Sequence, residues 1–177
     1  LGENPDAARR LDAAERMLLS SRAELRRCLL DLRGNALENA DFAAAIRKTT
    51  QPAIGDTALA VRFNVPRARL HDSTAHAILC IIRELASNGV RHGHATSVKV
   101  AGCLDGGKLL FSVRENGSGF APETAPGPDD GHFGLEGIRE RVRKLGGTFT
   151  LTSSPGGGTY SEIALDVPRA DNGGKIT

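Results

Sequence analysis

The sequence predicts an α+β two-layer sandwich, with helices on one face of a mixed sheet, preceded by one long helix. Two observations support this fold class. From residue 41 onward, segments with the period of an amphipathic helix are interleaved with segments that alternate apolar and polar residues, as half-buried strands do. Before them, Leu11, Leu18, Leu25 and Leu32 recur at intervals of seven residues, the repeat of a helix that packs against partner helices.

The long helix is expected to start at Asn4-Pro5, an N-cap followed by proline, and to stop at Gly34-Asn35. Its leucine seam is narrow and the rest of its surface is charged, so we expect a homodimer through residues 5–33. A solvated helix on the surface of the same domain is the alternative. The chain is therefore divided into a dimerisation helix at 1–36, a main domain at 37–170 and a polar tail at 171–177.

Within the main domain, each expected element follows from its own pattern and its own stop signals. Helices are expected over 41–51, over 69–92 and from Leu135 to Leu145, where Gly146-Gly147 ends the last one. Strands are expected over 58–65, 97–104, 108–114, 148–152 and 159–167. Asp105-Gly106-Gly107 predicts a hairpin, and a Gly/Pro-rich loop is expected over 116–133.

Composition excludes several classes of protein. The chain has 177 residues, 40% hydrophobic and 25% charged, which is ordinary for a folded domain, and its net charge of +2 does not indicate nucleic-acid binding. Three scattered cysteines suggest neither a disulfide framework nor a zinc module. The longest apolar run, 77–82, is too short to span a bilayer, so we expect no membrane contact by this segment. A start at Leu1 without a signal peptide suggests a piece of a longer protein.

Polar residues gather at four places that could bind a ligand. Glu84, Asn88 and Arg91 share the helix face opposite the apolar stripe, although a solvated face is the simpler interpretation. The segment 115–120 places a carboxylate at a strand end before glycines, which can read an amino group and leave room for a ring; alone it is only a turn. The segment 131–137 opens a helix whose free N–H groups suit phosphate, and 156–159 is a glycine-rich turn.

The order of these motifs resembles the N, G1, G2 and GT boxes of the GHKL ATPases, which have the Bergerat fold. The chain is similar to the nitrate-sensor-like (NarX/DesK-type) histidine kinases in particular, over about residues 9–168, and 25–33 resembles their second dimerisation helix. No P-loop pattern competes for nucleotide binding. His92 and His94 lack a third ligand at a familiar spacing, so no transition metal is expected.

The resemblance implies ATP and Mg as cofactors and assigns roles position by position. The implied catalytic residues are Glu84, Asn88, Arg91 and His92. The implied nucleotide-binding residues are Glu115, Gly117, Gly119, Gly134, Leu135, Gly137, Gly158 and Thr159. Asn88 would hold Mg²⁺, Glu84 would act as a base or orient water and Mg²⁺, Gly117 and Gly119 would flank adenine, and Gly134 and Gly137 the phosphates.

Two departures from the family pattern matter. Glu115 stands where the family has an aspartate that accepts a hydrogen bond from the adenine amino group, and the extra methylene predicts weaker adenine binding unless the surroundings retreat. The family's phosphorylated histidine has no counterpart, because no histidine precedes His71. It is expected upstream of Leu1.

The expected function is the ATP-dependent catalytic region of a cytoplasmic histidine kinase of a two-component system, compatible with the cytoplasmic part of a membrane-anchored sensor. It would phosphorylate a histidine outside this segment for relay to an aspartate of a response regulator. The alternative is a degenerate GHKL domain that acts as a dimerisation partner or phosphatase scaffold without productive ATP use. A serine kinase of the anti-sigma-factor type fits poorly, because that group lacks the long heptad helix.

Overall fold

The computed structural model describes residues 41–121 and 133–167. All of them lie in the second of two units into which the chain divides, Ala36–Thr177. The predicted dimerisation helix at 1–36 and the polar tail at 171–177 lie outside the described residues, and both stay predictions.

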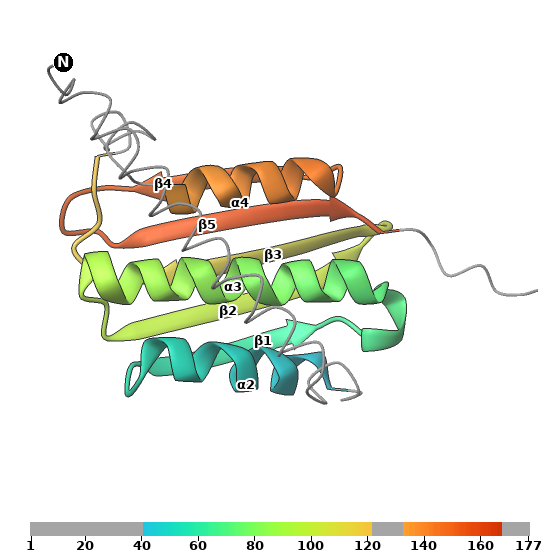
Figure 1. Ribbon diagram of the computed structural model, residues 1–177, viewed down its shortest axis with the longest axis horizontal. Coiled ribbons are helices and arrows are strands. Elements are labelled where there is room, and N and C mark those ends of the chain that lie inside the picture. The colour runs from blue at the N-terminus through green and yellow to red at the C-terminus, as the bar shows by residue number, and fades with distance from the viewer. Residues whose placement is uncertain (1–40, 122–132, 168–177) are drawn as a thin grey trace, which may run out of the picture. The chain divides into compact units, whose positions relative to one another are not determined.

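A mixed five-stranded sheet forms one layer of the domain (Figure 1). Its strands are β1 (Ala58–Asn64), β2 (Ser97–Asp105), β3 (Lys108–Glu115), β4 (Thr148–Ser153) and β5 (Thr159–Asp166). They lie in the order β1-β2-β3-β5-β4. The β1–β2 pair is parallel and the other pairs are antiparallel. The predicted hairpin is confirmed: Gly106 and Gly107 both have positive φ between the paired residues Asp105 and Lys108.

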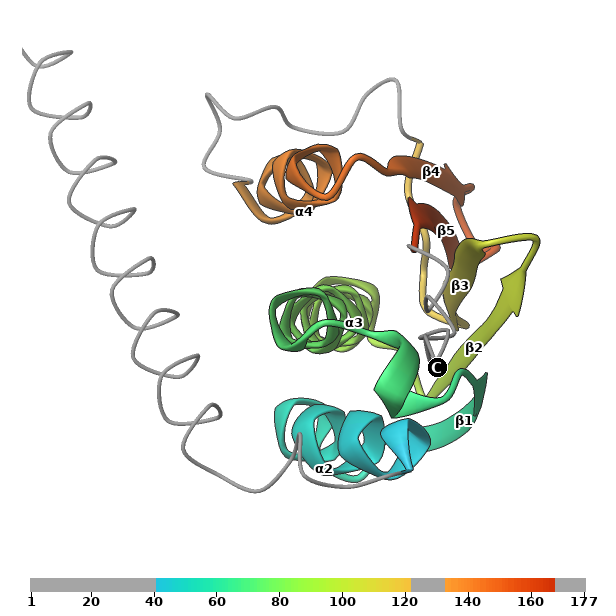
Figure 2. The ribbon, with the colours of Figure 1, turned by 90° about the vertical axis from the view of Figure 1, so that its right-hand side faces the viewer.

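The helices form the second layer, on one face of the sheet (Figure 2). They are α2 (Phe42–Ile54), α3 (Asp72–Gly93) and α4 (Phe133–Lys144), with a short 3₁₀ turn, η1, at Arg67–Arg69. The central helix, α3, lies between α2 and α4 (Figure 2). None of these described helices is long and apolar enough to cross a lipid bilayer. The two-layer α+β sandwich expected from the sequence is confirmed.

The core lies between α3 and the sheet. The whole predicted stripe of α3 is buried: Ala75, Ile78, Leu79, Ile82, Leu85, Ala86 and Gly89. Cys80 and Ile81, outside that stripe, are buried as well, because a helix with neighbours on both sides is covered over more than one face. Phe63 links α2 to the sheet, with its ring centroid 5.4 Å from that of Phe42 and 6.2 Å from that of Phe111.

Two predicted helix boundaries were wrong. The first helix continues through Pro52 to Ile54, because the proline lies in the last turn, where the Gln51 amide holds the chain by donating to the carbonyls of Gly55 and Thr57. The second helix begins at Asp72 rather than at 69, because 67–69 forms a separate 3₁₀ turn in which the Arg67 guanidinium donates to the carbonyl of Leu70. Hydrophobic periodicity carries no information about these local side-chain hydrogen bonds.

Candidate functional site

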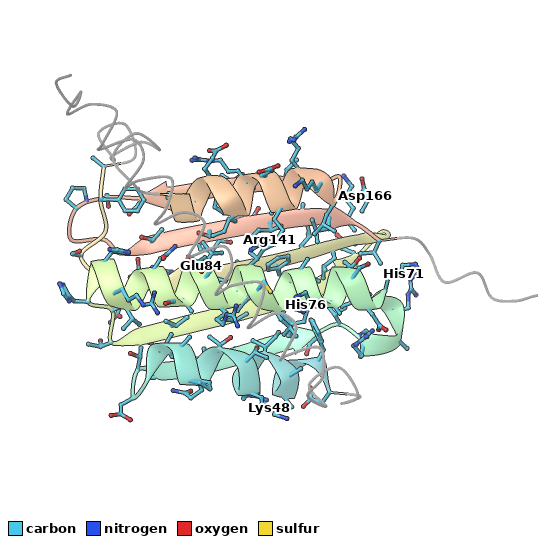
Figure 3. The ribbon with its side chains drawn as sticks, viewed as in Figure 1. Lys48, His71, His76, Glu84, Arg141 and Asp166 are labelled. Atoms are coloured by element: carbon cyan, nitrogen blue, oxygen red, sulfur yellow. The ribbon has the colours of Figure 1, made fainter. Side chains whose placement is uncertain are left out.

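Glu84 and Asn88 lie one turn apart on α3, and both face the first turn of α4. A Cβ atom placed on Gly134 would lie 3.1 Å from Asn88 Nδ2 and 3.3 Å from Glu84 Oε1. Both side chains are half-buried, and that of Glu84 is labelled in Figure 3. The structure thus brings three of the predicted residues together, and Glu84 and Asn88 are not part of a fully solvated face.

Arg91 and His92 follow within the next turn of α3 and are exposed. The helix ends just beyond them, where His94 adopts a left-handed conformation with φ 52° and the N–H of Ala95 donates to the carbonyl of Gly89. Arg91 and His92 therefore lie exposed at the same end of α3 as Asn88.

Glu115 ends β3 and is 5% exposed. Its Oε2 atom accepts a hydrogen bond from the backbone N–H of Gly117. Within residues 41–121 and 133–167, no other group donates to this carboxylate, so Oε1 has no donor there. Oε1 is not among the buried side-chain atoms that lack a hydrogen bond in these ranges, so it is open to a donor from outside them.

The glycines after Glu115 allow three segments to touch backbone to backbone. A Cβ atom on Gly117 would lie 2.4 Å from the carbonyl oxygen of Gly93, which also accepts the N–H of Ser118 at 2.7 Å. A Cβ atom on Gly119 would lie 2.1 Å from the carbonyl oxygen of Ser154. This packing requires glycine with or without a ligand, and the place of Gly117 and Gly119 beside a base stays a prediction.

The turn between β4 and β5 lies against the same strand end. Thr159 is paired with Glu115 across the β3–β5 ladder. A Cβ atom on Gly158 would lie 2.2 Å from the carbonyl oxygen of Glu115. The structure therefore places both predicted residues of this turn beside the backbone of Glu115.

Leu135 and Gly137 differ in their surroundings. Leu135 is half-buried and packs against the hydrophobic core, which explains an apolar residue there without a ligand. Gly137 is exposed, and a Cβ atom placed on it would meet nothing within 4 Å. Their assignment to a phosphate-binding segment stays a prediction.

Asn116 and Ser153 hold the site together, and sequence reasoning gave neither of them a role. Asn116 Oδ1 accepts the N–H groups of Thr96 at 3.0 Å and Ser97 at 2.8 Å. Ser153 Oγ accepts the N–H of Phe120 at 3.0 Å and donates to the carbonyl of Gly158 at 2.9 Å. Neither side chain gives a signal in the sequence, because Asn116 and Ser153 each bind backbone groups that are remote along the chain.

Comparison with known proteins agrees with this arrangement. The family model for histidine kinase-, DNA gyrase B- and HSP90-like ATPases matches residues 74–169. The chain belongs to this family of ATPases. The resemblance and the ATPase fold expected from the four motifs are therefore confirmed.

Two sensor proteins are among its relatives. The nitrate/nitrite sensor protein NarQ of Escherichia coli is 32% identical over 134 residues, which cover 73% of this chain and 23% of that protein. The sensor protein VraS of Staphylococcus haemolyticus is 28% identical over 166 residues, which cover 89% of this chain and 44% of that protein. The chain thus spans less than half the length of either relative.

Solved structures share the fold. The histidine kinase domain of the blue-light activated histidine kinase from Erythrobacter litoralis EL346 superposes with a TM-score of 0.57 at 21% identity, covering 71% of this chain and 61% of that one. The ATP binding domain of PrrB from Mycobacterium tuberculosis gives a TM-score of 0.56 at 20% identity, covering 73% of this chain and 94% of that one.

Proposed function

We propose that this domain uses ATP with Mg²⁺ to phosphorylate a histidine outside residues 1–177, from which the phosphoryl group passes to an aspartate of a response regulator. The observation that carries the proposal is the meeting of Glu84, Asn88 and Gly134 on one side of α3. The buried side chain of Glu115, at the end of β3, packs against Gly89, the residue that follows Asn88 on the same helix. An ATPase family membership supports the use of ATP.

ATP would lie with its base at Glu115 and its phosphates near the start of α4. The Oε1 atom of Glu115 would accept the adenine amino group, and the helix N-terminus at Gly134 would face the phosphates. Arg91, exposed at the same end of α3, would offset their negative charge, and the His92 imidazole beside it would donate a hydrogen bond to them. In the transfer, a bond forms between an imidazole nitrogen and the γ-phosphorus, the bond to the β–γ bridging oxygen breaks, and ADP leaves.

Asn88 and Glu84 would carry the metal and proton chemistry. An amide oxygen and a carboxylate one helical turn apart suit Mg²⁺. This ion prefers oxygen ligands and commonly binds protein oxygens and phosphate oxygens together. Bound there, Mg²⁺ would neutralise charge on the phosphate oxygens. Glu84 would accept the proton that the phosphorylated imidazole loses, or orient the water that does so.

The remaining parts of the proposal concern the assembly. We propose a homodimer through residues 5–33, a response regulator as partner, and a cytoplasmic location. The two-component role follows from the sensor proteins among the relatives. The dimer follows from the heptad of leucines.

Phosphorylation of the natural full-length protein with radiolabelled ATP tests this function. We expect Mg²⁺-dependent labelling of the parent and none in Asn88→Ala, with melting temperatures within about 2 °C of each other, because a half-buried amide at the edge of the core contributes little to stability. Asn64→Ala, an exposed asparagine on β1, is the matched control and should be labelled like the parent. Parental labelling in Asn88→Ala would refute the metal role, and an unlabelled parent would favour the degenerate scaffold.

A further inference from the structure

Gly89 lies on α3 directly against the side chain of Glu115. A Cβ atom placed on Gly89 would lie 2.6 Å from Glu115 Cγ, 3.1 Å from its Cβ and 3.2 Å from its Cδ. Non-bonded carbon atoms approach to about 3.5–4.0 Å. No residue larger than glycine therefore fits at position 89 while Glu115 keeps this conformation.

The atom nearest to Gly89 is the Cγ methylene carbon of Glu115. Aspartate also has a carbon at the γ position, in its carboxyl group, so an aspartate clears alanine at 89 only if it turns about its Cα–Cβ bond. An aspartate binds the N–H two residues ahead through a short local turn. Glu115 accepts the corresponding N–H, that of Gly117, with a side chain that is one methylene longer. This longer side chain occupies the space next to Gly89 where a Cβ atom would lie.

Glycine at position 89 is unfavourable for the helix that contains it. Gly89 is buried within a 22-residue helix, where alanine would favour helix formation more strongly. What the glycine provides is room for a carboxylate that is held at Oε2 by Gly117 while Oε1 has no donor among the described residues.

We propose that Gly89 is a positioning residue, which seats Glu115 so that Oε1 is offered to the amino group of an adenine base. The role rests on the proposed use of ATP, and it makes residues 89 and 115 a coupled pair. Alanine at 89 would push the longer carboxylate away from its position. A shorter aspartate at 115 can reach the N–H of Gly117 through a local turn with its Cγ rotated away from alanine.

The melting temperature of the nucleotide-free protein tests the packing of Glu115 against Gly89 separately from nucleotide binding. Gly89→Ala should lower the melting temperature, against the helix preference for alanine, and Glu115→Asp added to it should restore most of the loss. Glu115→Gln is the matched control: it has the same Cγ methylene and should restore nothing. A higher melting temperature in Gly89→Ala, or equal rescue by glutamine and aspartate, would overturn the proposal.

Calorimetric titration with ATP·Mg and GTP·Mg tests the link to the base. We expect ATP affinity at least about tenfold weaker in Gly89→Ala, loss of the preference for ATP over GTP, and recovery to within about threefold of the parent in the Gly89→Ala/Glu115→Asp variant. Unchanged ATP affinity in Gly89→Ala would overturn the proposal. A parent that binds no ATP would instead refute the proposed function, while the nucleotide-free melts still decide the packing of Glu115 against Gly89.

Discussion

Glu115 is the only charged side chain that is buried among the residues the structure describes. Its extra methylene, compared with the aspartate of the family pattern, led to an expectation of weaker adenine binding unless the surroundings retreat. Gly89 has no Cβ and leaves the space that the Cγ methylene of Glu115 fills, while the strength of adenine binding stays a prediction. At the scale of single residues, the glutamate is accommodated by the glycine it packs against.

Tyr160 gives a prediction that can be measured on one chromophore, because the chain has one tyrosine and no tryptophan. Its hydroxyl donates to Glu162 Oε2 at 2.7 Å, and this hydrogen bond, with a contribution from burial, raises the pKa of Tyr160. A raised pKa in the folded state stabilises the protein below the ordinary tyrosine pKa of about 10, and this contribution is lost as the pH rises through the folded pKa.

Tyrosinate absorbance during an alkaline titration measures this pKa directly. The parent midpoint should lie above the ordinary tyrosine value, and Glu162→Ala should move it down, because the acceptor and its negative charge are removed. Identical midpoints in the two proteins would show that the Tyr160–Glu162 hydrogen bond does not form in solution.

At the scale of elements, the effect of a glycine on stability depends on which atoms surround the position its Cβ would occupy. Gly102 on β2 is paired with Phe63 and Phe111 on its two neighbours, and a Cβ atom on it would lie 2.4 Å from Phe63 Cε2. Gly137 on α4 has open space around its Cβ position. One glycine is required by packing and the other is not.

Replacing each glycine by alanine should therefore shift stability in opposite directions. Gly102→Ala should lower the free energy of unfolding by about 1–3 kcal/mol, because the Phe63 ring must move. Gly137→Ala should raise it by up to about 1 kcal/mol through helix propensity. Urea denaturation followed by circular dichroism measures both, and a Gly102→Ala variant as stable as the parent would contradict the observed packing.

The elements themselves could be predicted because their patterns are local. Alternation identified β1, the glycine-rich turn at 153–158 marked off β4 and β5, and the apolar stripe of α3 was predicted residue by residue. Helix ends were harder, since Pro52 and the turn at Arg67–Arg69 depend on local side-chain hydrogen bonds. The packing of Gly89 against Glu115 could not be predicted, because periodicity shows that Gly89 is buried and does not show which side chain covers it.

At the scale of the whole domain, the candidate site is assembled from four segments that are remote in sequence. The C-terminal half of α3, the end of β3, the start of α4 and the β4–β5 turn meet at one end of the sandwich, on the left in Figure 1. The order of motifs predicted which segments would meet. It could not predict the bonds of Asn116 and Ser153 that fasten them, because each joins residues brought together only by folding.

Calorimetric titration of the chain with ATP·Mg is the most direct test of the account, whose central claim is a nucleotide site between α3 and α4 with its base at Glu115. The parent should release or absorb heat with a saturable isotherm and melt at a higher temperature with millimolar ATP·Mg. Glu115→Ala should bind more weakly by roughly 1–3 kcal/mol. No heat and no melting shift at millimolar ATP·Mg, or equal affinities of the parent and Glu115→Ala, would contradict the claim.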